Sequence, residues 1–205
     1  MDKSKTLTDF EYDALKEVGN IGIGQASTSL SKMMNKPVNI SLPSLKLIPL
    51  VQLPQLVRFE EPVVGIIQQL KGDEKGYLLL MLSMESAKKM LRLMLGSAEE
   101  TSAFDEMEKS ALQELGNIMN GTYISSISNF LGISLGISTP FEVYDMSDAL
   151  INQVVGQMIA EVNDVLFLKT EFTINSEKID GVILVFTDSL SLSKILDAIN
   201  RLLGK

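Results

Sequence analysis

The chain contains no cysteine and no histidine among its 205 residues. Without cysteine there can be no disulfide framework, thiolate nucleophile or zinc-thiolate site, which is compatible with a reducing cytoplasm. Without histidine there is no imidazole general base, no histidine-based catalytic triad and none of the common histidine-containing metal sites. Any chemistry must therefore rest on carboxylates, amides, hydroxyls, amines or the groups of a partner.

Long apolar runs are also missing. The longest run, Tyr77 to Leu82, is far shorter than the roughly 18 residues that indicate a membrane span. Polar residues interrupt the first twenty positions throughout, so they lack the apolar core of a signal peptide. We therefore predict a cytoplasmic protein without membrane insertion.

Positive charge is scarce. Lysine and arginine number 18 against 26 aspartate and glutamate residues, which gives a formal net charge of -8. Nucleic-acid binding depends on clustered lysine and arginine, so we exclude nucleic acid as a partner. The hydrophobic content of 45% suits a packed core, in one large domain or two small halves.

The sequence contains an internal repeat. Residues 13–31 and 110–128 align without a gap at a constant offset of 97. The shared pairs are Ala14/Ala111, Leu15/Leu112, Glu17/Glu114, Gly19/Gly116, Asn20/Asn117, Ile21/Ile118, Gly24/Gly121 and Ser31/Ser128, and Glu11/Glu108 and Pro43/Pro140 keep the same register. Residues 76–95 and 181–200 also correspond, at an offset of 105, which places an insertion of about eight residues in the second half.

This repeat predicts a mixed α/β fold of the α+β type. We expect a single pseudo-twofold symmetric domain over 1–205, with halves of about 1–100 and 101–205 and a central, largely antiparallel sheet flanked by helices. The boundary between the halves is expected at Gly96–Ala103, which is small and polar. The patterns predict helices over 8–35, 84–96, 104–131, 147–161 and up to about 203, and extended segments over 37–50, 62–71, 76–83, 133–145, 163–174 and 179–187.

The repeated helix is expected to display one polar stripe in each copy. At about 100° per residue, Asp13, Glu17, Asn20 and Gly24 form a first stripe, and Ser110, Glu114, Asn117 and Gly121 form a second. Apolar residues occupy the opposite face of the first helix, namely Leu15, Val18, Gly22, Ala26, Leu30 and Met33. We therefore expect both stripes to be exposed.

Glycines interrupt the first helix at an energetic cost. Gly19, Gly22 and Gly24 together oppose helix formation by roughly 3 kcal/mol. Their order, G-x-x-G-x-G with no preceding strand, does not match a nucleotide-binding loop. Close packing is the favoured explanation for Gly19 and Gly22, whereas Gly24 is open either to internal packing or to close approach by another molecule.

An isolated Glu-x-x-Asn would be interpreted as a solvated helical surface, but here the pair recurs at the same phase of two related helices. Neither side chain is a strong nucleophile. An amide can orient a water molecule, and a carboxylate can bind a cation on a partner. This combination is typical of a protein that acts on a phosphoryl group held by another molecule.

The duplicated pattern [DS]-x-x-x-E-x-x-N, with its GNIGIGQA and GNIMNGTY contexts, resembles the CheC-type phosphatases of chemotaxis over essentially the whole chain. The resemblance implies that phosphorylated CheY is the substrate. It implies that Asn20 and Asn117 orient water toward the aspartyl phosphate, and that Glu17 and Glu114 engage a lysine of CheY. No cofactor of its own is implied, because Mg²⁺ would come with CheY.

Asp13 and Ser110 are secondary candidates, since an exposed Asp or Ser has many ordinary explanations. The family also binds CheD, a receptor-modifying deamidase, through a region that Thr139–Val162 resembles, and Asp145 is the position implied for that contact. A core-packed amphipathic helix explains the same segment equally simply. A further alternative for the whole chain is a non-catalytic scaffold related to the middle domain of the flagellar switch protein FliM.

Overall fold

The computed structural model describes residues 7–96, 104–158 and 162–202. Its helices are α1 (Asp9–Met34), η1 (Leu50–Gln52, a 3-10 turn), α2 (Leu53–Leu56), α3 (Met84–Leu95), α4 (Glu106–Leu131), α5 (Ser147–Met158) and α6 (Ser189–Leu202). Its strands are β1 (Val38–Pro49), β2 (Val63–Gly72), β3 (Gly76–Ser83), β4 (Leu135–Ile137), β5 (Phe141–Asp145), β6 (Asp164–Ile174) and β7 (Glu177–Thr187). Apart from Gly96, the predicted boundary between the halves lies outside the described residues.

The strands pair antiparallel in the order β1-β6-β7-β3-β2-β4, and β5 also pairs with β2. If each strand is replaced by its equivalent in the other half, the order becomes its own reverse. The equivalent strands are β2 and β6, β3 and β7, and β1 with the β4–β5 pair. A pseudo-twofold axis therefore passes between β3 and β7, which confirms the predicted symmetric, antiparallel α+β fold.

The two halves exchange their edge strands. Strand β1 of the first half pairs with β6 of the second, and β4 and β5 of the second half pair with β2 of the first. Neither half therefore completes its own part of the sheet. Backbone hydrogen bonds between the halves run along both outer strand pairs as well as along β3 and β7.

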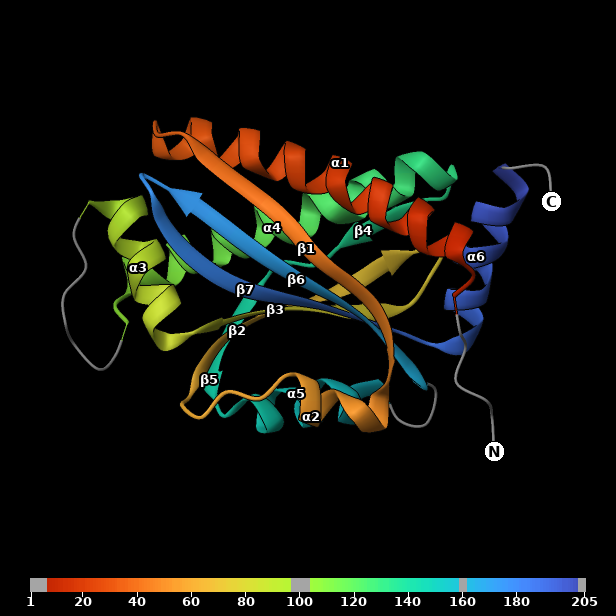
Figure 1. Cartoon of the computed structure of the whole chain (residues 1–205). Coiled ribbons are helices and arrows are strands. Elements are labelled where there is room, and N and C mark those ends of the chain that lie inside the picture. The colour runs from red at the N-terminus through yellow and green to blue at the C-terminus, as the bar shows by residue number, and fades with distance from the viewer. Residues whose placement is uncertain (1–6, 97–103, 159–161, 203–205) are drawn as a thin grey trace.

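Helices cover both faces of the sheet (Figure 1). Helices α1 and α4 lie along one face with α3 and α6 at their ends, while α2 and α5 cover the other. The apolar run of β3 supplies both cores in alternation: Leu78 and Leu80 face the first, and Leu79 and Met81 face the second. A strand buried on both faces needs apolar residues at successive positions, which explains the uninterrupted run.

Two details of the predicted elements are wrong. The continuous strand expected over 133–145 is divided into β4 and β5, because Pro140 lies between them and has no backbone N–H for a strand ladder. Its counterpart Pro43 lies where the pairing of β1 with β6 shifts register. The short helix α2 was not expected from the sequence.

Helices α1 and α4 pack closely because α1 carries glycine at their contact. A Cβ at Gly22 would lie 2.9 Å from the backbone Cα of Tyr123, which is too close for any side chain. A Cβ at Gly24 would meet nothing within 4 Å. The packing explanation therefore holds for Gly22, and Gly24 is open to solvent.

These two glycines should respond oppositely to alanine. Gly22→Ala should lower the free energy of unfolding. The clash with the backbone of α4 costs about 1–3 kcal/mol, which outweighs the roughly 1 kcal/mol that alanine gains over glycine in helix propensity. Gly24→Ala should raise it by up to about 1 kcal/mol. Urea denaturation followed by circular dichroism measures both values, and a Gly22→Ala protein as stable as Gly24→Ala would contradict the close contact.

Candidate functional site

The two helices that carry the predicted residues begin in the same way. In α1, Glu11 N donates to Thr8 Oγ1 at 3.2 Å and Thr8 N donates to the Glu11 carboxylate at 2.8 Å. In α4, Asp105 and Glu108 make the same reciprocal pair, at 2.7 and 3.0 Å. These capping boxes start both 26-residue helices at equivalent positions and give the shared glutamates Glu11 and Glu108 a structural role.

A shared serine joins the end of each helix to the strand that follows. Val38 N donates to Ser31 Oγ at 2.9 Å, and Leu135 N donates to Ser128 Oγ at 3.3 Å. Donor and acceptor both differ by 97 between the two halves. The recurrence of serine at these positions is thus explained by the connection between helix and sheet.

The shared glycines Gly19 and Gly116 face the sheet. A Cβ would lie 2.8 Å from a methyl carbon of Leu42 at the first position, and 2.3 Å from a methyl carbon of Ile66 at the second. Glycine therefore permits close helix-to-sheet packing at both positions, which was the explanation expected for Gly19.

The two polar stripes remain after these structural roles are assigned. Asp13, Glu17, Asn20 and Gly24 are all exposed, as are Ser110, Glu114 and Asn117, while Gly121 is half-buried. Within residues 7–96, 104–158 and 162–202, the side chains of Asp13, Glu17, Asn20 and Glu114 make no hydrogen bond or ion pair. Each stripe brings a carboxylate and an amide together on an outward-facing helix surface. Such a surface can act only with groups that another molecule supplies.

Two of the other predicted residues use their polar atoms locally. The Ser110 hydroxyl donates to the Glu106 carbonyl oxygen at 2.8 Å, within the turn of its own helix. Asp145, at the end of β5, is exposed and accepts a hydrogen bond from the backbone N–H of Met146 at 2.7 Å. The expectation of one apolar face that includes Met33 is wrong, because Met33 is 41% exposed and Met34 is buried instead.

A buried pair of amides beneath the second stripe was not predicted from the sequence. Gln68 of β2 and Asn120 of α4 are both fully buried, and Gln68 Nε2 lies 3.5 Å from Asn117 Oδ1. One signal was available: Asn120 is polar where the other copy of the repeat has Ile23. The contribution of Gln68 depends on how β2 packs under α4, which the repeat does not reveal.

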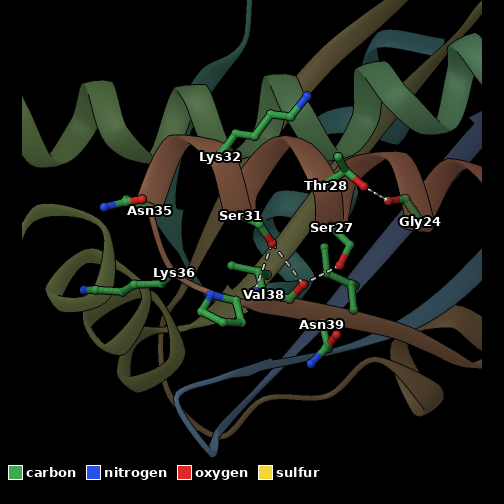
Figure 2. Close-up of a pocket in the computed structure, with 11 residues that line it drawn as sticks. Gly24, Ser27, Thr28, Ser31, Lys32, Asn35, Lys36, Val38 and Asn39 are labelled. Carbon is green, nitrogen blue, oxygen red and sulfur yellow. Dashed lines mark hydrogen bonds between the residues drawn. The ribbon is translucent and has the colours of Figure 1, made fainter.

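A shallow pocket of about 750 Å³ lies beside Gly24, between the end of α1 and the start of β1 (Figure 2). Its hydroxyl groups are already engaged. Ser27 and Ser31 donate to the Val38 carbonyl oxygen, and Thr28 donates to the Gly24 carbonyl oxygen at 3.0 Å. These bonds hold the helix against the strand, so the pocket is explained as the junction between the two elements.

The described residues contain no group of three or more acidic side chains arranged to hold a metal ion. In the same part of the chain, no helix combines the length and the apolar character needed to cross a bilayer.

The sequence matches two family models. Residues 10–47 match the CheC-like family, and residues 63–157 match the chemotaxis phosphatase CheX. Among curated proteins, the CheY-P phosphatase CheC of Bacillus subtilis is 30% identical over 154 residues, an alignment that covers 72% of this chain and 72% of that protein.

Solved structures share the fold. The FliY structure from Thermotoga maritima has a TM-score of 0.79 at 24% identity and covers 96% of this chain and 99% of that one. The CheX-CheY-BeF3-Mg²⁺ complex from Borrelia burgdorferi contains a chain with a TM-score of 0.51 at 20% identity, covering 84% of this chain and 97% of that one.

Proposed function

The chain belongs to the CheC-type family of chemotaxis phosphatases, and from that premise we propose that it accelerates hydrolysis of the aspartyl phosphate on the response regulator CheY. One observation carries the proposal. The capping glutamates, the linking serines and the packed glycines of the repeat have structural roles, whereas Glu17, Asn20, Glu114 and Asn117 are exposed on both helices. The same amide and carboxylate at equivalent positions of two helices are best explained by one kind of partner that binds both surfaces.

In this proposal, Asn20 and Asn117 each enter the phosphorylated site of CheY and hold a water molecule in line with the phosphorus. The water oxygen forms a bond to phosphorus, the bond from phosphorus to the aspartyl oxygen breaks, and inorganic phosphate leaves. The amide supplies position rather than bond-making chemistry, as water-orienting side chains do in other phosphoryl transfers. An outward-facing helix is suited to this role because it can insert into a cleft on its partner.

Glu17 and Glu114 act in docking. Each lies one helical turn before its asparagine, so it reaches a neighbouring part of the same partner surface. A lysine of CheY is the proposed contact, through a charge-assisted hydrogen bond. The reacting phosphate and its Mg²⁺ belong to CheY in this scheme. The Borrelia burgdorferi complex supports this assignment, since CheX, CheY, BeF3 and Mg²⁺ are found together there.

Removal of the two asparagines should abolish the acceleration. Asn20→Ala and Asn117→Ala should each lose the contribution of one site, and the double variant should release phosphate from CheY-phosphate only at the spontaneous rate. Asn129→Ala is the matched control, because Asn129 is an exposed asparagine of α4 outside the second stripe. The assay follows phosphate release from radiolabelled CheY-phosphate with Mg²⁺.

Full acceleration by the double variant would rule out the proposed mechanism. If the unmodified protein instead bound flagellar switch components stably without accelerating release, the scaffold alternative would be favoured.

Loss of the glutamates should weaken docking more than turnover. Glu17→Ala with Glu114→Ala should raise the KM for CheY-phosphate by about tenfold or more, the effect of one lost hydrogen bond to a charged group. The value of kcat should change less, because the amides remain. Glu61→Ala removes an exposed carboxylate outside both stripes and should leave KM unchanged. A fall in kcat at constant KM would assign the glutamates to the chemical step instead.

We also propose that CheD binds around Asp145. The exposed carboxylate of Asp145 lies between Tyr144 and Met146, whose side chains are 36% and 41% exposed. A charge beside exposed apolar groups is typical of a protein contact. Leu150 and Val154, by contrast, are buried against the sheet, so the helix that follows also has the core-packing role of the alternative explanation.

Charge reversal tests this contact. Asp145→Lys should weaken CheD binding by at least tenfold, because it places a cation where an anion is recognised. Asp148→Lys is the matched control, since Asp148 is an exposed aspartate in the first turn of α5. Calorimetric titration with CheD measures both affinities, and equal affinities for the two variants would move the contact away from Asp145.

A further inference from the structure

Asn117 has polar support from below that Asn20 lacks. Gln68 Nε2 donates to the Ser138 carbonyl oxygen at 2.9 Å and reaches Asn117 Oδ1 at 3.5 Å. Asn120 Nδ2 donates to Gln68 Oε1 at 2.9 Å. Both ends of the Gln68 amide are therefore engaged, and its orientation is determined by Asn120 and Ser138 together. In the described part of the chain, the Asn20 side chain has no hydrogen-bond partner.

The pseudo-twofold symmetry identifies what stands in the other half. Gln68 faces Leu78 across β2 and β3, and Leu168 faces Ile183 across β6 and β7. Leu78 and Ile183 correspond in the repeat at its offset of 105. In the register of these hairpins Leu168 is therefore the counterpart of Gln68, and it is fully buried in the same core. In the register of the edge strands, where Ser138 lies opposite Gln69 and Ser41 opposite Glu171, the counterpart is the buried Thr170. Neither residue carries an amide.

The two groups that orient Gln68, the Asn120 amide and the Ser138 carbonyl oxygen, are not reproduced in the first half either. The counterpart of Asn120 is Ile23, which is buried. The counterpart of Ser138 is Ser41, which pairs with Glu171 within a longer strand, whereas Ser138 lies in the break between β4 and β5. The break leaves the Ser138 carbonyl oxygen available to the Gln68 side chain.

Packing alone does not explain the amides. Ile23 stands in the first copy of the repeat where Asn120 stands in the second, so the fold does not require an amide at that position. Asn120 Oδ1 is moreover buried without a hydrogen-bond partner among the described residues. A buried polar group that is left unpaired opposes folding, and such departures from efficient packing concentrate at functional sites.

We propose that Gln68, oriented by Asn120 and Ser138, is a positioning residue that restrains the amide of Asn117, so that the two phosphatase sites are unequal. The proposal rests on the phosphatase function proposed above. Asn117 is presented to CheY in a restricted orientation, whereas Asn20 must be ordered during docking. Restriction of the side chain before binding favours the productive geometry, so the second site has the higher kcat.

Gln68→Met tests the proposal, because methionine has a similar length and no hydrogen-bonding amide. It is introduced into Asn20→Ala, where only the second site works, and into Asn117→Ala, where only the first works. In the first background kcat should fall about fivefold, as for loss of one neutral hydrogen bond, while KM for CheY-phosphate stays constant. In the second background both values should stay constant. Leu168→Met is the matched control and should leave both backgrounds unaltered.

A second measurement does not depend on activity. In the free protein, nuclear magnetic resonance order parameters should show the Asn117 side-chain amide more restrained than that of Asn20, and Gln68→Met should remove the difference. Equal mobility of the two amides would overturn the proposal, and so would an equal effect of Gln68→Met on both backgrounds, which indicates general destabilisation. Failure of the proposed phosphatase function is recognised separately. In that case the Asn20→Ala/Asn117→Ala protein and the unmodified protein would release phosphate from CheY-phosphate at the same rate.

Discussion

The contact between α1 and α4 is the constraint on which the arrangement of both stripes depends. Gly22 brings the backbone of α1 against that of α4 at Tyr123. The tyrosine ring is fully buried, and within the described residues its hydroxyl has no hydrogen-bond partner. Burial raises the pKa of Tyr123, so the phenol remains neutral. The helices therefore rest on apolar packing, and the rotation of each about its axis is fixed by that contact and by the sheet below.

That fixed rotation separates the structural residues of the repeat from the exposed ones. Gly19, Gly22 and Gly116 face inward with Leu15 and Leu112, and the capping and linking residues secure the helix ends. What is left on the outer surface is a carboxylate and an amide in each copy. This surface faces outward. In the proposed mechanism it depends on its partner for the phosphate, the metal ion and the enclosing walls.

Sequence patterns predicted this surface well because it depends on helical geometry alone. The ends of α1 and α4, the inward glycines and the outward Glu17 and Asn20 all follow from a period of 3.6 residues. Prediction failed where longer-range geometry decides. Met33 was placed on the buried face, but the sheet twists under α1 and the buried face drifts around the helix toward Met34. Gln68 could not be found, since its contact with Asn117 depends on the register between a strand and a helix 49 residues apart.

The exchange of edge strands has a consequence for how the sequences of the two halves can diverge during evolution. Two identical half-chains could in principle build the same sheet as a homodimer, but every substitution would then appear at both sites. In one continuous chain the copies are free to diverge, as Ile23 and Asn120 have done. Covalent fusion therefore allows one surface to be tuned for turnover and the other for choice of partner, a division of labour that identical subunits cannot make.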